Sequence, residues 1–191
     1  MSTNDATLRA ALLPRSNALT DTALVVGGAA FIAVCAQVAI PLWFTPVPLT
    51  LQTFAVLGVG AALGAWRGGA ATLLYLLAGA VGLPVYAEGA AGTARLLGAT
   101  GGYLVGMVLA AVLVGWLAQR RAADRRLATS VLAMVAGDVV VLGVGTVWLA
   151  VVLGVPMGRA VALGVTPFLA VEVLKVAAAA GALPAAWRGV R

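Results

Sequence analysis

Glu172 and Lys175 are two residues of opposite charge that stand three positions apart inside an apolar run from Pro167 to Leu183. On an α-helix this spacing puts both side chains on one face, within reach of each other. An ionisable residue at membrane depth is costly and rare, and it usually marks a functional site. A ligand against this pair would meet a carboxylate and an ammonium together. The alternative is a structural ion pair, which adds little net stability once desolvation is counted.

Four further polar positions could take part in binding a ligand. Arg95 stands in a glycine-rich segment, where it is either a surface charge or a guanidinium that binds a carboxylate through two hydrogen bonds. Thr50 and Gln52 stand near the start of an apolar run. They either hydrogen-bond between membrane helices, as such residues commonly do, or contact a ligand. Asp138 interrupts another apolar run, and the sequence leaves open whether it pairs with a neighbour or lines a cavity.

The composition places these positions in a membrane. The chain is 63% hydrophobic and 9% charged, and its mean hydropathy is +1.09. A soluble domain of 191 residues could not cover so much apolar surface, so we expect an all-α integral membrane protein. The net charge of +6 does not indicate nucleic-acid binding, since arginines gather on the cytoplasmic side of membrane proteins.

The residue inventory also disfavours catalysis. There is no histidine, and the one cysteine is Cys35, inside the first apolar run. Transition-metal sites and Cys/His catalytic sites therefore have almost no ligands to draw on. We expect no metal, no catalytic residue and no enzymatic activity.

Six membrane-spanning helices fit the apolar runs, since a span needs roughly 20 mainly apolar residues. Their expected ranges are 23–41, 49–65, 70–83, 102–118, 127–153 and 167–183. Residues 66–69 should form a tight turn between the second and third helices. Thr166 and Pro167 should be the N-cap and the first residue of the last helix.

A single membrane domain over residues 23–184 follows from these ranges. A cytoplasmic N-terminal segment over 1–22 should precede it, and a cytoplasmic tail over 185–191 should follow. The N-terminal segment has no apolar region of its own, so we expect the first span to be retained and not cleaved as a signal peptide.

The distribution of arginines predicts that both termini are cytoplasmic. With the N-terminus inside, the inner segments hold nine arginines, namely Arg9, Arg15, Arg67, Arg120, Arg121, Arg125, Arg126, Arg188 and Arg191. The outer segments hold only Arg95 and Arg159, and Lys175 lies within a span. Positive charge favours the cytoplasmic side, so this bias favours an even number of spans.

The same topology puts the glycine-rich segment 84–101 on the outer side. Glu172 and Lys175 would lie roughly 8–12 Å into the last helix, at 1.5 Å per residue, beneath that segment. The segment lacks the G-K-[ST] ending of a phosphate-binding loop. It is either a flexible connection or a lid that folds over a small ligand. Elsewhere, Ala29 and Ala33 form a small-residue pattern that serves internal packing or docks another membrane protein.

Four strings of residues, in order along the chain, carry a family resemblance. They are V-P-L-T-L-Q-T-F (47–54), Y-L-L-A-G-A-V-G-L-P-V-Y-A-E-G (75–89), A-R-L-L-G-A-T-G-G-Y-L-V-G (94–106) and P-F-L-A-V-E-V-L-K (167–175). Together they resemble the BioY family, the biotin-binding S components of energy-coupling factor (ECF) transporters. The chain departs from the family pattern at two of these positions: Glu172 stands where Asp is usual, and Ala99 stands where Pro is usual.

The resemblance implies a six-helix protein of the bacterial cytoplasmic membrane that takes up biotin and has no cofactor. Its implied partners are membrane lipids, a transmembrane coupling protein and two cytoplasmic ATPase subunits, which alone use ATP. The small-residue docking motif would map to Ala29 and Ala33. An S component for another vitamin, and a stand-alone carrier that uses Glu172 as a proton site, remain alternatives.

The resemblance also implies a pocket for biotin. Glu172 would accept a hydrogen bond from the ureido group, while Lys175 and Arg95 would bind the ureido carbonyl or the valerate carboxylate. The aromatic and apolar side chains expected to pack on the ring and chain are Leu83, Tyr86 and Tyr103, with Thr50 and Gln52 as polar contacts.

Overall fold

The computed structural model describes residues 7–8, 17–121 and 127–188. Within this part the chain is mainly helical, which confirms the expected all-α class. The main helices are α2 (Ala18–Gln37), α3 (Gln52–Leu63), α4 (Ala65–Ala80), α6 (Gly101–Arg121), α7 (Leu127–Leu153) and α9 (Leu169–Arg188). Shorter elements are β1 (Ala39–Ile40), β2 (Leu49–Thr50), the 3₁₀ turn η2 (Ala87–Gly89), α5 (Thr93–Leu97) and α8 (Met157–Gly164).

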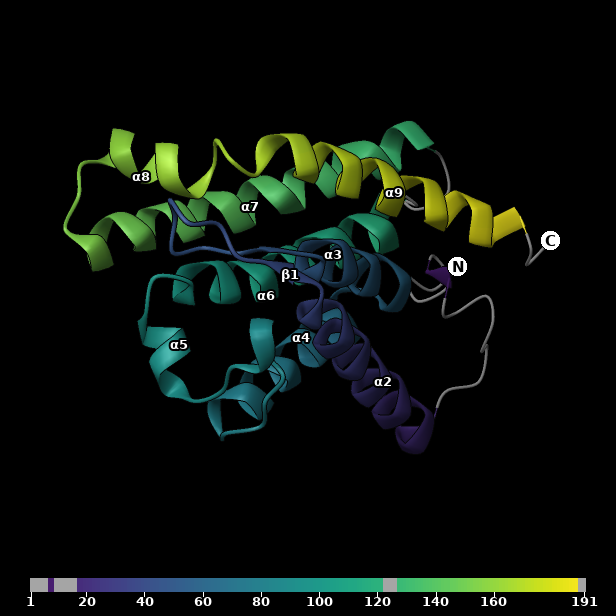
Figure 1. Cartoon of the computed structure of the whole chain (residues 1–191). Helices are drawn as coiled ribbons and strands as arrows, with labels where there is room; N and C mark the ends of the chain where they lie inside the picture. The colour runs from purple at the N-terminus through teal and green to yellow at the C-terminus, as the bar shows by residue number, and fades with distance from the viewer. Residues whose placement is uncertain (1–6, 9–16, 122–126, 189–191) are drawn as a thin grey trace.

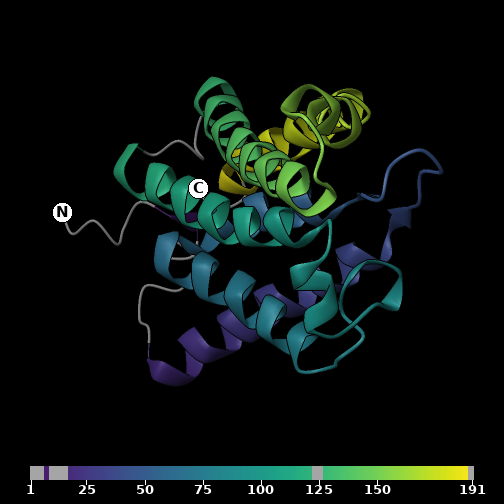
Figure 2. The same cartoon turned by 90° about the vertical axis from the view of Figure 1, so that its left-hand side faces the viewer.

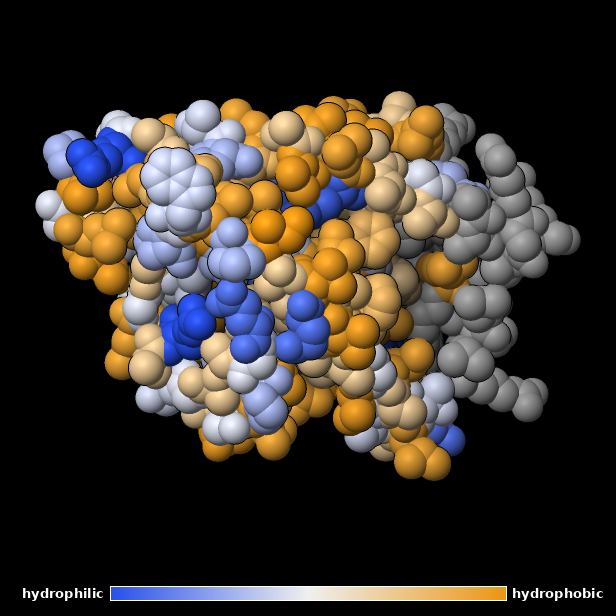
Figure 3. Space-filling model, viewed as in Figure 1, coloured by the Kyte–Doolittle hydropathy of each residue, from blue (hydrophilic) through white to orange (hydrophobic). Residues whose placement is uncertain are grey.

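Three of these helices, α2, α6 and α7, are long and apolar enough to cross a membrane. The pair α8 and α9 forms a fourth candidate span, bent by 55° at the break between its halves. Large apolar side chains such as Val26, Leu132 and Val139 are exposed, and apolar residues cover most of the face in Figure 3. An apolar exterior of this extent fits a lipid environment. The chain is therefore a multi-pass membrane protein, while the count of six spans stays a prediction.

Helix α6 lies at the centre of the bundle, where it packs against α7, α3 and α4. Helix α2 packs on α4, and α9 packs on α7 and α3 (Figures 1 and 2). In Figure 1 the start of α2 and the end of α9 lie at the right, whereas α5 and α8 lie at the left. The loops around α5 and helix α8 thus lie toward the same end of the molecule.

The first helix begins earlier than the sequence predicted because Asn17 caps it. The Asn17 side chain accepts a hydrogen bond from the backbone N–H of Thr20 at 2.8 Å, which satisfies one of the free donors of the first turn. After α2 the chain forms an antiparallel ribbon in which Ala39 pairs with Thr50. The sequence analysis missed this ribbon, and its second strand occupies the expected start of the second helix.

The expected tight turn at residues 66–69 is wrong, because those residues lie inside α4. The chain turns at Gly64, whose φ of 86° and ψ of 173° suit glycine alone. Gly68 serves close packing instead. A Cβ on Gly68 would lie 2.7 Å from the Cα of Gly60 on α3, so only glycine lets these two helices approach so closely.

The expected start of the last helix is also wrong. Thr166 does not cap α9, since its hydroxyl donates to the carbonyl of Val161 in α8 at 3.4 Å. Pro167 and Phe168 lie in the turn between α8 and α9. The first turn of α9 uses the carbonyl of Phe168, which accepts from the N–H of Glu172 at 2.8 Å. This break gives the side chain of Phe168 access to the site described next.

Candidate functional site

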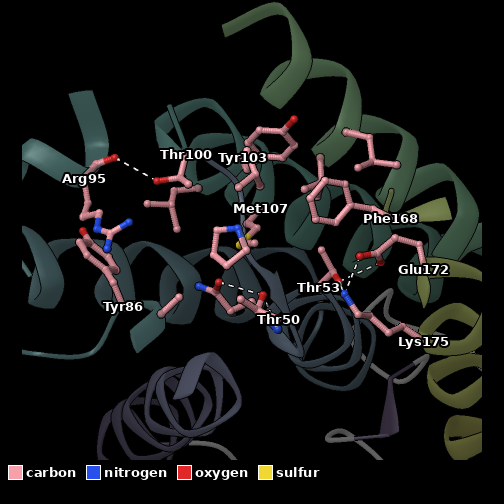
Figure 4. A pocket seen from close by; sticks show the side chains of 17 residues that line it. Thr50, Thr53, Tyr86, Arg95, Thr100, Tyr103, Met107, Phe168, Glu172 and Lys175 are labelled. Carbon is pink, nitrogen blue, oxygen red and sulfur yellow. Dashed lines mark hydrogen bonds and ion pairs between the residues drawn. The ribbon is translucent and has the colours of Figure 1, made fainter. Parts of the chain in front are cut away.

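A cavity of about 60 Å³ lies between the helices of the bundle and the loops that precede α3 and α6. Seventeen residues line it (Figure 4). They come from the segments 47–50 and 86–100, from Phe168 before α9, and from helices α3, α5, α6, α7 and α9. Seven of the eight binding residues expected from the sequence are among them, namely Thr50, Gln52, Tyr86, Arg95, Tyr103, Glu172 and Lys175. The fold therefore brings into one cavity residues that are more than 120 positions apart in the chain.

The charged pair forms one wall of the cavity. Glu172 and Lys175 are only 5% and 6% exposed, and the Lys175 ammonium donates to Oε1 of Glu172 at 2.5 Å. Thr53 on α3, which the sequence analysis missed, completes the cluster. Its hydroxyl donates to Oε2 of Glu172 at 2.9 Å and accepts from Lys175 at 3.1 Å. An ammonium has three donors and a carboxylate about four acceptor positions, so both groups keep capacity for a ligand.

Arg95 provides a second cation at the other end of the cavity. Figure 4 shows it on the opposite side of the lined space from Glu172 and Lys175. Its side chain is 38% exposed, and its closest acid is Glu88 in the same loop, at 3.8 Å. An exposed pair at that distance contributes little, so the guanidinium can exchange Glu88 for a ligand carboxylate.

Thr50 and Gln52 form a polar strip between the two cations. The Thr50 hydroxyl donates to Oε1 of Gln52 at 3.0 Å. The Gln52 amide donates to the hydroxyl of Tyr75 on α4 at 2.5 Å. The bond to Tyr75 shows that Gln52 hydrogen-bonds between helices, which was one of its two expected roles. The amide keeps a second N–H that can serve a ligand.

The rings of Tyr86 and Tyr103 each pack directly against a glycine, and this close packing fixes their positions. A Cβ on Gly79 would overlap the ring of Tyr86, and a Cβ on Gly145 would overlap the ring of Tyr103. The hydroxyl of Tyr86 donates to the carbonyl of Leu76 at 2.6 Å, and burial raises the pKa of Tyr86, so this donor stays protonated. The rings thus present rigid apolar faces to the cavity.

Leu83 was expected beside these rings, and that expectation is wrong. Its side chain is exposed and is absent from the cavity lining. Its place is taken by apolar residues that the sequence analysis did not single out, including Val47, Leu104, Met107, Val141 and Phe168. Phe168 could not have been found without knowing that the last span is broken before α9.

The segment expected to act as a lid covers part of the cavity through Tyr86, Ala87, Arg95 and Thr100. Side-chain hydrogen bonds attach it to the neighbouring helices. The amide of Gln37 at the end of α2 donates to the carbonyls of Val85 and Tyr86, both at 3.2 Å, and accepts from the N–H of Gly89 at 3.1 Å. Further along, the Trp148 indole donates to the carbonyl of Gly98 at 2.9 Å.

The structure places the two expected docking residues on an inward face of α2. Ala29 is buried in the hydrophobic core, and Ala33 is half-buried and packs against the same core. Internal packing, one of the two expected roles, is therefore what the structure shows for Ala29. A docking role for the pair stays a prediction.

Comparison with known proteins gives the family to which the chain belongs. A profile of the BioY family matches residues 5–191, nearly the whole chain. The chain belongs to the BioY family. It is 38% identical to the biotin transporter BioY2 of Lactococcus lactis over 152 residues, which are 80% of this chain and 81% of that protein. It is 36% identical to a probable biotin transporter BioY of Pyrococcus horikoshii over 159 residues, 83% of this chain and 91% of that protein.

A solved structure supports the same fold for this BioY chain. The crystal structure of the S component for biotin from an ECF-type ABC transporter superposes with a TM-score of 0.81, covering 89% of this chain and 92% of that one. The two sequences are 22% identical over the alignment. The bundle arrangement is therefore shared.

Proposed function

We propose that this BioY chain binds biotin in the cavity and acts as the S component of an ECF-type ABC transporter for biotin uptake. The observation that carries the proposal is the buried Glu172–Lys175 pair, which faces the cavity with Arg95 at its far end. The protein is a transporter and not an enzyme. Transport makes and breaks no covalent bond of the ligand, so the cavity needs binding groups and no catalytic ones.

Biotin offers complementary groups to these residues. Its ureido ring has two N–H donors and a carbonyl acceptor, and its valerate chain ends in a carboxylate. Glu172 accepts from a ureido N–H, and Lys175 beside it donates to the ureido carbonyl. Arg95 binds the carboxylate, because it is the more exposed cation and stands nearer the outer loops. The rings of Tyr86 and Tyr103 pack against the bicyclic ring and the chain.

The protein lies in the bacterial cytoplasmic membrane, with six spans over residues 23–184 and with residues 1–22 and 185–191 cytoplasmic. In support, the start of α2 and the end of α9 lie on the same side in Figure 1, opposite α5 and α8. A transmembrane coupling protein, docked near Ala29 and Ala33, and two ATPase subunits drive release to the inside. In the printed sequence the only lysine is Lys175, so no phosphate-binding G-K-[ST] motif is present.

Equilibrium binding of radiolabelled biotin to the purified protein tests the proposal. Saturable binding at sub-micromolar ligand is expected, with competition by unlabelled biotin and none by vitamins that lack a ureido group. Absence of saturable binding, or equal competition by such vitamins, would refute biotin as the ligand. Uptake in cells without the coupling protein and ATPases distinguishes an S component from a stand-alone carrier.

A further inference from the structure

The loop over residues 41–48, between β1 and β2, carries two aromatic side chains that no step of the proposed function uses. Trp43 is 95% exposed and Phe44 is 44% exposed, and their rings meet edge to face with centroids 5.3 Å apart. Ile40, just before the loop, is exposed as well. A cluster of exposed apolar side chains commonly marks a surface that binds a membrane or a protein. These residues therefore form an interaction surface.

The opposite side of the same loop is attached to the rest of the protein. Thr45 is buried, and its hydroxyl donates to the carbonyl of Leu163 in α8 at 2.8 Å. The same hydroxyl accepts from the N–H of Val47 at 3.3 Å. Val47 and Pro48 line the cavity. One short segment thus contributes to the cavity wall and presents two aromatic rings outward.

The neighbouring helices place this loop near the edge of the hydrocarbon core. Helix α2, which ends just before β1, has 20 residues. It is therefore about 30 Å long and matches the thickness of that core. Helix α8 runs back along α7 from the turn that joins them (Figure 1). Leu163 near its end lies roughly 9 Å back from Met157 at 1.5 Å per residue, so the loop that it binds is held beside the bundle.

The direction of the loop favours lipid over water. Figure 2 looks onto the end of the molecule that carries α5 and α8, and it shows the blue loop between β1 and β2 projecting sideways from the bundle. Lipid surrounds a membrane protein in that direction. No charged residue occurs between Asp21 and Arg67 in the sequence, so the loop brings no charge that lipid would have to accommodate. Tryptophan suits the membrane interface because its ring is apolar and its N–H is polar.

We propose that Trp43 and Phe44 anchor the loop in the lipid interface, among the headgroups and the first carbons of the acyl chains. The partner is the bilayer surface itself, and its headgroup charge is immaterial because the loop is uncharged. Together with the bond from Thr45 to α8, the anchor holds Val47 and Pro48 in the cavity wall. The role in the cavity wall rests on the proposed function, whereas the anchor does not.

Tryptophan fluorescence in reconstituted bilayers tests the anchor without any ligand. The difference in emission between the wild type and Trp43→Phe isolates Trp43. Phospholipid brominated near the headgroup end of its acyl chains should quench this difference more than phospholipid brominated near the chain ends. The quenching should be equal in phosphatidylcholine and in mixtures with anionic phosphatidylglycerol.

Two results would overturn the anchor. Quenching by aqueous iodide without quenching by brominated lipid would put the loop in water, as expected for a surface that meets a protein partner. Stronger quenching by bromine at the chain ends would put Trp43 in the hydrocarbon core and not at the interface.

Biotin binding in lipid nanodiscs tests the role in the cavity wall. The double variant Trp43→Ser/Phe44→Ser removes both rings and leaves Thr45 and Val47 in place. It should bind radiolabelled biotin about 3- to 10-fold more weakly than the wild type, because binding must then order a looser wall. Leu19→Ser, at an exposed site at the start of α2, is the control and should bind as the wild type does.

The two assays separate this inference from the proposed function. Wild-type affinity in the double variant would overturn the role of the loop in the cavity wall. If the wild type itself does not bind biotin, the proposed function fails, and the fluorescence result alone decides the anchor.

Discussion

Thr53 on α3 donates a hydrogen bond to Glu172 on α9 at 2.9 Å, and so joins two helices at the wall of the cavity. The same hydroxyl accepts from Lys175 at 3.1 Å. Each member of the cluster therefore contacts the other two, which fixes their side chains before a ligand arrives. Fixing groups in advance reduces the conformational entropy that is lost on binding.

Thr53→Val tests this fixing role. Valine keeps the shape of threonine but removes the hydroxyl, so Glu172 and Lys175 each lose a partner while their own bond remains. Affinity for biotin should fall about 5- to 10-fold, as for one net hydrogen bond. Thr53→Ser restores the hydroxyl and should recover most of the affinity in the same binding assay. Equal affinity of the valine and serine variants would contradict the role.

Arg95→Gln tests the assignment of the carboxylate. The wild type should bind biotin more tightly than biotinamide, in which the carboxylate is replaced by a neutral amide. The Arg95→Gln protein should bind both ligands with similar affinity, because only the carboxylate loses its cation. Competition binding measures the ratio, and Arg159→Gln, at the exposed arginine of α8, is the matched control. If Arg95→Gln keeps the wild-type preference, another group binds the carboxylate.

Gly145→Ala tests the fixed position of Tyr103. The added methyl group would overlap the tyrosine ring, so the ring must move into the cavity or the helices must separate. Overpacking of this kind costs about 1–3 kcal/mol, and we expect a lower unfolding temperature together with weaker biotin binding. Gly143→Ala places the same methyl group in open space two residues away on α7. It should leave the unfolding temperature and biotin binding unchanged. If Gly145→Ala changes neither the unfolding temperature nor biotin binding, Tyr103 moves freely and is not fixed by this glycine.

Gln37→Ala tests the attachment of the lid. The variant removes three contacts between α2 and the loop at Val85, Tyr86 and Gly89. Biotin should dissociate about fivefold faster or more, since each such bond contributes about 1 kcal/mol. Thr22→Ala, at an exposed site on α2, is the control. An unchanged dissociation rate would mean that other contacts keep the loop closed.

The sequence was most informative where a residue type was costly in its surroundings. Glu172 and Lys175 stood out because charge is rare in an apolar run, and the structure places both on the cavity. Thr53 could have been found in the same way only by knowing which face of α3 meets α9. That relationship depends on packing between helices more than 100 residues apart, which local patterns do not encode.

Glycine residues caused the main error in the helix boundaries predicted from the sequence. Gly68 and Gly69 suggested a turn at residues 66–69, yet both lie inside α4, and the chain turns at Gly64, which has a positive φ. Gly68 allows two helices to approach, and close approach leaves no signal in local sequence. The break between α8 and α9 was missed for a related reason, because Thr166 and Pro167 resemble a helix start whether the preceding residues are loop or helix.

The direct test of the central claim is biotin binding to a protein in which the charged pair is removed as a unit. Glu172→Gln or Lys175→Met alone leaves a buried charge without its partner and should destabilise the fold by about 3–5 kcal/mol. The double variant leaves no unpaired charge in the pair and should unfold at a higher temperature than either single variant. We predict that this folded double variant shows no saturable binding of radiolabelled biotin, while the wild type binds at sub-micromolar ligand. Wild-type affinity in the double variant would show that the pair is structural and would contradict the account.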